Sequence, residues 1–375
     1  MSEYIIRMVG DDLIHKQVYE AAYKGDGYNF DIMFENIRNL IDEADLSIIN
    51  QETILVSDYK DISSFPAFGS PAELADSIVR AGFNVVLHAS NHSLDKKYKG
   101  IEDALAIWRK HKDITVIGIH DSQADAEKMR IVTVGDMKVA LLNYSEKMNF
   151  HPMPFGKPYA VDRMRKRDRN KIAAQIRRAK SKADLVIVMP HWGCEYLYEP
   201  VPSQKEWAAF FADSGADLII GTHPHVVQYK EDIRTSDGRL VPCLYSLGNF
   251  ISCQVIPGTC IGGMADIRVE FDQNARIKNA DIIPLMTHTD RDYSYFTTYP
   301  LEKYTRELAE ENKILTVMAK RSGQKRMDPD SLNNLFIDIM EKRAMADAMF
   351  KKPMDVTISN VKGVFAALTG KNTKD

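Results

Sequence analysis

Short apolar runs alternate with segments of helical periodicity through the first two-thirds of the chain. The runs expected to form strands are Ile5–Val9, Leu46–Ile49, Val85–Leu87, Val116–Ile117, Leu185–Met189 and Leu218–Ile220. The segments expected to form helices between them are Phe30–Glu43, Pro71–Ala81, Ile101–His111, Arg165–Ser181 and Ser203–Ser214. This alternation of strands and helices predicts a layered α/β fold.

Turn and capping signals add antiparallel hairpins to this pattern. Glycine and aspartate form the expected turns between Ile131–Val134 and Lys138–Asn143 and before Leu240–Leu247, and a turn near Asn274 separates Gly263–Phe271 from Ile277–Ile283. Ser203 and Glu206 have the spacing of a capping box, which predicts a helix start at Ser203. The fold is therefore expected to combine βαβ units with hairpins.

The pattern changes after about Tyr299. Leu301–Lys320 and Ser331–Phe350 have helical periodicity with mixed charge, and Gly323 and Pro329 lie between them. We therefore predict a main domain over residues 1–298 and a helical C-terminal extension over residues 299–375.

The composition excludes several classes of protein. The chain has 375 residues, 45% of them hydrophobic, and a net charge of −3, so no strong basic field indicates nucleic-acid binding. Its four cysteines form no C-x-x-C pair, which is not the pattern of a disulfide framework. No apolar stretch approaches the roughly 18 residues of a membrane span, and the N-terminus lacks the order of a signal peptide. The cytoplasm is the expected compartment, unless a leader has been removed.

Polar side chains follow five of the predicted strands directly. The groups are Asp11, Asp12 and His15; Asn50 and Glu52; His88, Asn91 and His92; His191 and Glu195; and His223 and His225. Ligands of open α/β sheets bind beyond the carboxyl ends of strands, so we expect these side chains to meet. Any one histidine alone is more typical of a hydrogen-bonded core or surface residue, but five such groups together favour a site.

Imidazole, carboxylate and amide oxygen together indicate metal chemistry. Imidazole and carboxylate bind zinc, manganese or iron, and one carboxylate can bridge two ions. Two ions about 3.5–4 Å apart can hold a phosphoryl group and supply a hydroxide nucleophile.

The same residues carry a family resemblance. The stretches are "VGDDLIH", "DLSIINQET", "FGSPAELADSIVRAGFNVVLHASNHSLD", "VIVMPHWGCEYLYEPVPSQ", "GADLIIGTHPHVVQ" and "LYSLGNF", in that order. Over roughly Ile5 to Phe250 the chain resembles the CapA family of capsule and poly-γ-glutamate synthesis proteins, within the calcineurin-like metallophosphoesterase superfamily. The resemblance implies a four-layer α/β/β/α sandwich with a two-metal site at the strand ends.

The resemblance also implies residue roles. Asp11 and His225 would bind the first metal, Glu52 would bridge, and Asn91, His191 and His223 would bind the second. His92 would contact substrate and protonate the leaving oxygen, which suits an imidazole that titrates near neutral pH. Further candidates, as ligands or as residues that support ligands, are His15, Asp12, Asn50, Glu195 and Asn249. Asp95 is expected either to orient His92 or to cap a helix.

Two positions depart from the wider superfamily. Leu13 occupies the place where many phosphoesterases have a histidine, so His15 is a candidate substitute. Glu52 stands where most of them have an aspartate, as is usual in CapA-like sequences.

The expected function is hydrolysis of a phosphoester or related anionic substrate by a metal-bound hydroxide, with two divalent ions of manganese, iron or zinc. The alternatives are a factor of capsule or poly-γ-glutamate biosynthesis that binds polymer or partners around a structural metal site, and a metal-dependent γ-glutamyl amide hydrolase. The basic run Arg163–Lys171 fits either a polyanion contact or a solvated helix face.

Overall fold

The first of two facing sheets carries the N-terminal strand at its centre. The computed structural model describes residues 2–149 and 151–342. The strands of this sheet lie in the order β16 (Phe296–Pro300), β15 (Ala275–Thr289), β14 (Ile261–Phe271), β1 (Ser2–Asp12), β2 (Leu46–Gln51), β5 (Val85–Leu87) and β6 (Thr115–Ile117), and β13 (Asn249–Ile251) pairs with the end of β1. Strands β1, β2, β5 and β6 are parallel, whereas β14, β15 and β16 are antiparallel. The parallel half brings three candidate strand ends to one edge.

The second sheet has the predicted hairpins at its two sides. Its order is β11 (Val227–Arg234), β12 (Leu240–Leu247), β10 (Leu218–Ile220), β9 (Leu185–His191), β8 (Met137–Ser145) and β7 (Arg130–Val134). The four inner strands are parallel, and β11 and β7 close hairpins with β12 and β8. A separate short pair joins β3 (Leu55–Val56) to β4 (Ser70–Pro71).

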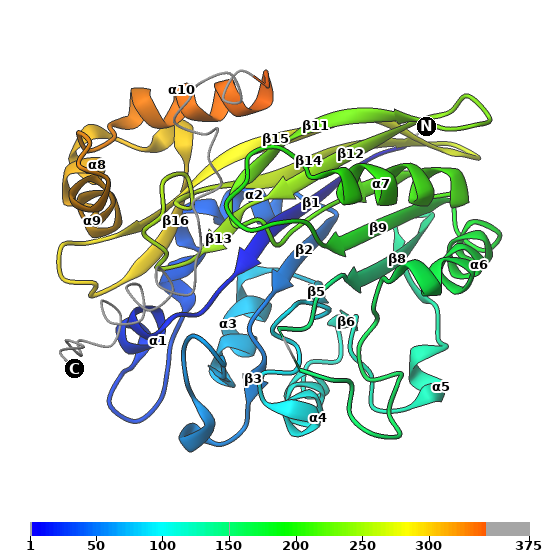
Figure 1. The fold of residues 1–375 in the computed structure, drawn as a ribbon, viewed down its shortest axis with the longest axis horizontal. Helices are drawn as coiled ribbons and strands as arrows, with labels where there is room; N and C mark the ends of the chain where they lie inside the picture. The colour runs from blue at the N-terminus through cyan, green and yellow to red at the C-terminus, as the bar shows by residue number, and fades with distance from the viewer. Residues whose placement is uncertain (1, 150, 343–375) are drawn as a thin grey trace.

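Helices cover the outer faces of both sheets, which confirms the predicted four layers (Figure 1). Contacts of β12 with β1 and β14 join the sheets face to face. On the outside of the second sheet, α6 (Arg169–Lys180) and α7 (Pro202–Ser214) pack Ile176 and Phe211 against Val188 and Trp192. The outside of the first sheet is covered by α2 (Arg38–Asp42), α3 (Glu73–Ala81) and α4 (Lys97–Trp108).

Two predicted helices begin or continue differently in the structure. The segment predicted as one helix over Phe30–Glu43 forms the 3-10 turns η1 (Asp31–Met33) and η2 (Glu35–Ile37) before α2. Phe30, Met33, Phe34 and Ile37 are all buried at the spacing of one helical face, as predicted. The backbone differs, because the N–H groups of Met33, Phe34 and Ile37 bond to the carbonyl three residues earlier, which makes 3-10 turns instead of an α-helix. The prediction of a helix start at Ser203 was also wrong: Pro202 opens α7, and Val201 N–H donates to Gln204 Oε1 at 2.9 Å.

The remaining helices are short. They are α1 (Lys16–Ala22), α5 (Gln123–Ala126) and the 3-10 turns η3 (Tyr59–Asp61) and η4 (Lys166–Asp168). The predicted helix over Arg165–Ser181 therefore appears as η4 followed by α6. Among the described residues, no helix is both long enough and apolar enough to cross a bilayer.

The C-terminal helices are η5 (Leu301–Lys303), α8 (Arg306–Glu311), α9 (Lys313–Ser322) and α10 (Pro329–Met340). η5 and α9 contact β15 of the first sheet, whereas α10 contacts β11 of the second. The helix predicted over Leu301–Lys320 is broken at Asn312, whose side chain caps α9 and donates to Thr287 O at 3.0 Å. The end of the helix predicted to reach Phe350 lies outside the described residues. The predicted domain boundary at residue 298 falls inside β16, and the division into two domains stays a prediction.

Gly10 allows β1 to approach β13 directly before Asp11. A Cβ at this position would lie 2.0 Å from the Gly248 carbonyl oxygen. We predict that Gly10→Ala lowers the free energy of unfolding by about 1–3 kcal/mol, because backbone atoms must shift to admit the methyl group. Urea denaturation measures this loss. Gly27→Ala is the control, because its Cβ would meet Glu73 Oε1 at an ordinary 3.4 Å, and equal midpoints for the two variants would contradict the argument.

Candidate metal centre

The carboxyl ends of strands from both sheets meet at one buried site. Asp11 belongs to the end of β1, Glu52 follows β2, and His191 is the last residue of β9. Asn91 and His92 lie in the turn after β5, and His223 and His225 lie in the turn after β10. All seven side chains are at most 5% exposed. The structure therefore brings together every residue to which the family resemblance gave a ligand or acid role.

One group of atoms surrounds His191 Nε2. Asn91 Oδ1 lies 2.8 Å from it and His223 Nδ1 lies 3.1 Å from it. Glu52 Oε1 completes the group at 3.7 Å. Two ligands bound to one ion at about 2.0–2.2 Å are roughly 3–3.5 Å apart, so this spacing fits a common cation.

A second group surrounds His225 Nδ1. Asp11 Oδ2 lies 3.2 Å from it and Glu52 Oε2 lies 3.8 Å from it. Asn249 Oδ1 is 3.0 Å from the same nitrogen, so this asparagine, predicted as a supporting residue, contacts a candidate ligand. The two oxygens of Glu52 thus face different groups, one around His191 and the other around His225.

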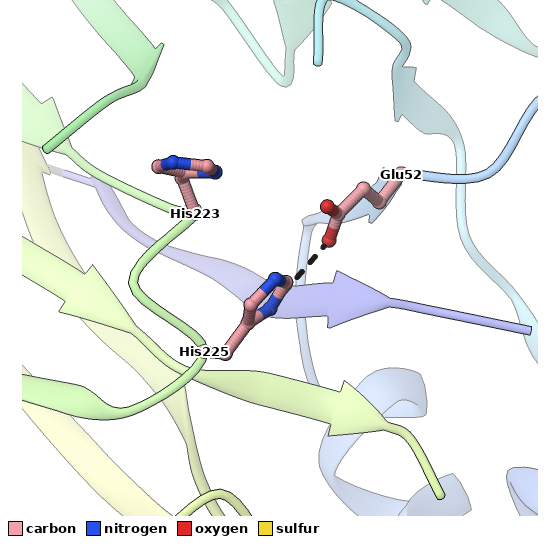
Figure 2. A group of neighbouring side chains, drawn as sticks. All are labelled: Glu52, His223 and His225. Atoms are coloured by element: carbon pink, nitrogen blue, oxygen red, sulfur yellow. Dashed lines mark ion pairs between the residues drawn. The ribbon is translucent and has the colours of Figure 1, made fainter. Parts of the chain in front are cut away.

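Figure 2 shows Glu52 facing the two turn histidines, with its ion pair to His225. Glu52, His223 and His225 offer ligand atoms that all lie within 4.8 Å of one another. Both Glu52 oxygens and His223 Nε2 are buried, and none of the described residues gives them a hydrogen bond. Buried polar atoms are almost always paired, so these unpaired atoms fit a bound cation.

Strained backbone positions the two turn histidines. His223 and His225 have φ values of 101° and 59°, a region that non-glycine residues rarely adopt. The turn is held by His223 N–H, which donates to Asp11 Oδ2 at 3.2 Å, and by Thr222 N–H, which donates to Pro190 O. Such strain persists where surrounding contacts over-determine the backbone, as is common at functional sites.

Burial keeps two of the imidazoles neutral. It lowers the pKa of His191 to about 3 and holds the pKa of His223 well below its usual range. Neutral imidazole is the form that binds metal. Thr222 Oγ1 lies 3.0 Å from His191 Nδ1, which leaves Nε2 to face the other candidate ligands.

His225 and Glu52 shift each other's pKa values. Burial disfavours a cationic His225, but Glu52 and Asp11 outweigh burial and raise its pKa to about 10. Burial and the negative Asp11 raise the pKa of Glu52 well above its usual range. Without a cation, the site therefore holds protons at neutral pH.

Asp95 orients His92, which is one of the two roles that the sequence predicted for this aspartate. His92 Nδ1 lies 2.6 Å from Asp95 Oδ2, which also accepts Phe68 N–H at 2.7 Å. His92 Nε2 then faces the centre, 3.9 Å from Glu52 Oε1. The Phe68 ring packs edge-on against His92, with ring centroids 4.7 Å apart.

The remaining candidates lie around these groups. Asn50 Nδ2 donates to Asp11 Oδ1 at 2.8 Å. His15 Nδ1 instead lies near Leu13 O and accepts Cys253 N–H, and burial lowers its pKa to about 3. Asp12 is buried with no hydrogen bond or ion pair to these ligands, and burial raises its pKa well above its usual range. Glu195 is half-buried beside Tyr196.

Sequence reasoning missed the loop after β8. Asn149, with φ 36°, accepts from Asn91 Nδ2 at 3.1 Å and places its own Nδ2 3.2 Å from His92 Nδ1. Lys147 donates to Gly193 O at 2.7 Å, and its charge acts on His191. The one available signal was that this loop follows a predicted strand.

Residues 5–254 match the family described as bacterial capsule synthesis protein PGA_cap. The capsule biosynthesis protein CapA of Bacillus anthracis is 28% identical over 74% of this chain and 66% of its own length. The PGA biosynthesis protein CapA of Bacillus subtilis (strain 168) is 32% identical over 45% of this chain and 42% of its own length. The chain thus spans less than two-thirds of the length of the curated relatives it matches.

Solved structures share a looser similarity. A Staphylococcus aureus protein assigned as a 5′-nucleotidase, in complex with α-ketoglutarate, has a TM-score of 0.49 and 15% identity over 76% of this chain and 54% of its own. The NAD nucleotidase of Haemophilus influenzae has a TM-score of 0.43 and 9% identity over 92% and 61%. The fold assignment therefore depends on the strand order and layers described above.

The family match covers two-thirds of the chain and includes all the candidate ligands. This chain belongs to the PGA_cap family of bacterial capsule synthesis proteins.

Proposed function

We propose that this protein is a hydrolase with two divalent metal ions, which acts on a phosphoester or a related anionic substrate. The observation that carries the proposal is the position of Glu52, whose two buried and unpaired oxygens face two separate histidine groups. A buried carboxylate whose two oxygens have no hydrogen-bond partner in the described chain and face imidazoles fits a bridge between two cations.

The proposed ligand sets follow from this bridge. Asp11 and His225 would hold one ion, and Asn91, His191 and His223 would hold the other. Two such ions would act as Lewis acids and would supply a hydroxide nucleophile near neutral pH. Manganese, iron and zinc all accept this mixture of imidazole, carboxylate and amide ligands.

The chain's own residues would orient the reaction. Asn50 fixes the Asp11 carboxylate through its bond to Oδ1, and Asp95 fixes the His92 ring through Nδ1. His92 Nε2 would then donate a proton to the leaving oxygen, with Asp95 stabilising the imidazolium. Lys147 adds positive charge beside the centre, which favours an anionic substrate.

The names of the relatives favour a second candidate with a capsule polymer as the substrate. Two of them are described as capsule or PGA biosynthesis proteins. A centre with two metals can also attack amides, so cleavage of γ-glutamyl bonds fits the same residues. In a third reading, the protein binds polymer or partners and the metals are structural.

Substitution of the bridge and of the acid tests the first candidate. With added manganese, iron(II) or zinc, we expect the protein to hydrolyse an aryl phosphate, and Glu52→Ala and His223→Ala to abolish turnover. His92→Ala should lower kcat/KM by about 10²–10⁴-fold, because it removes the proton donor. Initial rates measure each effect.

His111→Gln is the matched control, since this histidine pairs with Asp76 on α3, outside the ligand groups. Turnover that survives Glu52→Ala, or none with any of the three metals, contradicts the phosphoester proposal. Cleavage of a γ-glutamyl peptide but not of the aryl phosphate favours the amide hydrolase instead.

Metal binding should release protons. The pKa of His225, raised to about 10 by Glu52 and Asp11, means that the metal-free site holds a proton at pH 7, and metal ligands must be deprotonated. We predict release of at least one proton per chain on binding. The release should shrink above pH 10, where His225 is already deprotonated.

Calorimetry in buffers of different ionisation enthalpy measures this release at each pH. His225→Ala should reduce the number of protons released at pH 7. A binding enthalpy that is independent of the buffer would contradict the protonation argument.

A further inference from the structure

A cavity lies away from the metal centre, at the side of the molecule where the edges of the two sheets meet. It has a volume of about 180 Å³ and is lined by residues from the end of β6, α5, β8 and α6. Figure 1 shows where these elements lie in the fold. Strands β6 and β7 are the terminal strands of their sheets, so no further strand fills the space between them. Pockets for drug-sized ligands run from roughly 300 to 1,000 Å³, so this cavity suits a smaller molecule.

One face of α6 turns polar side chains toward the cavity. Lys171, Gln175 and Arg178 line it, and their spacing of four and three residues places them on one helical face. The apolar face of the same helix packs Ile172 and Ile176 into the core beneath. Tyr144, buried in the cavity wall, donates its hydroxyl proton to Gln175 Oε1 at 3.0 Å, which leaves the Gln175 amide nitrogen as a donor.

These donors lack acidic partners within the described residues. Lys171 has no hydrogen bond or ion pair there, and Arg178 has only a long contact of 3.4 Å to Glu127 O. The Gln175 amide nitrogen likewise has no acceptor in that part of the chain. Two cations and an amide donor on one face form a positively charged mouth.

Two acids near the cavity, Asp162 and Asp125, are already paired with cations. Asp162 Oδ2 lies 2.8 Å from His120 Nε2, and Asp125 lies 3.2 Å from His120 Nδ1. Arg130 Nη2 donates to both Asp125 oxygens at 2.9 Å. Burial disfavours a cationic His120, but the bonds to Asp162 and Asp125 outweigh burial and raise its pKa. The charges of Asp162 and Asp125 are therefore compensated. Glu127, which is exposed and also lines the cavity, accepts from Gln123 Nε2 at 2.7 Å and has no cationic partner among the described residues, so it leaves one carboxylate beside the two cations of α6.

The floor of the cavity is apolar. Ile117 and Leu141 are buried there, and Met129 and Leu142 are half-buried. A ligand with a short carbon body would cover this floor while its charged end reaches the α6 donors. Charge-assisted hydrogen bonds of this kind are among the stronger polar contacts in proteins.

We propose that this cavity is a second binding site, separate from the metal centre, for a small organic anion whose carboxylate or phosphate is bound by Lys171, Gln175 and Arg178. The site belongs to α6 and the sheet edges. Binding there is independent of metal and of the hydrolysis proposed above.

Calorimetric titration with three probes tests the site. The probes are glutarate as a dicarboxylate, inorganic phosphate, and glutaramide as the neutral control of similar shape. We expect an anion to bind one site per chain at millimolar concentration or below, and glutaramide not to bind. Tighter binding of glutarate than of phosphate would identify the ligand of this site as a carboxylate, and tighter binding of phosphate would identify it as a phosphate.

Variants of α6 distinguish binding in the cavity from nonspecific attraction of the anion to the positive charge of this helix. Lys171→Ala combined with Arg178→Ala should weaken anion binding by about tenfold or more, since both side chains are exposed enough to be removed without unfolding the core. Arg178→Ala alone and Arg177→Ala form the matched pair, because each removes one positive charge from the same helix and only Arg178 lines the cavity. Arg178→Ala should weaken binding more than Arg177→Ala.

The result does not depend on the metal centre. Binding of the anion should persist in His223→Ala, which removes a proposed metal ligand. The proposal is overturned if neither anion binds, if Arg177→Ala weakens binding as much as Arg178→Ala, or if His223→Ala abolishes binding.

Discussion

The rest of the site depends on one buried carboxylate. Glu52 is fully buried, and neither of its oxygens has a hydrogen-bond partner within the described chain. Burial of an isolated charged carboxylate is costly unless a cation or a proton compensates it. His225 supplies part of that compensation and is itself driven toward the cationic form. A bound cation would compensate the rest of this charge and would also pair the buried atoms that have no hydrogen-bond partner in the described chain, such as His223 Nε2.

The fold makes this arrangement possible by turning two sheets so that their carboxyl ends meet. Asp11 and Glu52 come from the first sheet, whereas His191, His223 and His225 come from the second. Neither sheet alone carries all of the proposed ligands. The close approach of Gly10 to Gly248 and the strained turn after β10 both lie at this junction. The same backbone contacts that hold the strained turn therefore also fix the positions of His223 and His225.

Much of this arrangement could be predicted because strand ends are marked in the sequence. The predicted runs Val85–Leu87, Leu218–Ile220 and Leu240–Leu247 coincide with β5, β10 and β12. The apolar pattern did not distinguish 3-10 turns from an α-helix over Phe30–Glu43, where the buried positions have the predicted spacing. Other failures depended on tertiary contacts, such as the bond from Asn312 to Thr287 at the end of α8. The approach of Asn149 to His92 likewise depends on how the second sheet is placed.

The central claim is that Glu52 bridges two cations, and metal content tests it most directly. Elemental analysis of protein loaded with manganese, iron(II) or zinc and freed of unbound metal should give two ions per chain. Glu52→Gln keeps the shape of the side chain and removes its charge, and should lower that number to one or none. A single ion per chain in the unsubstituted protein, or two ions retained in Glu52→Gln, would contradict the account.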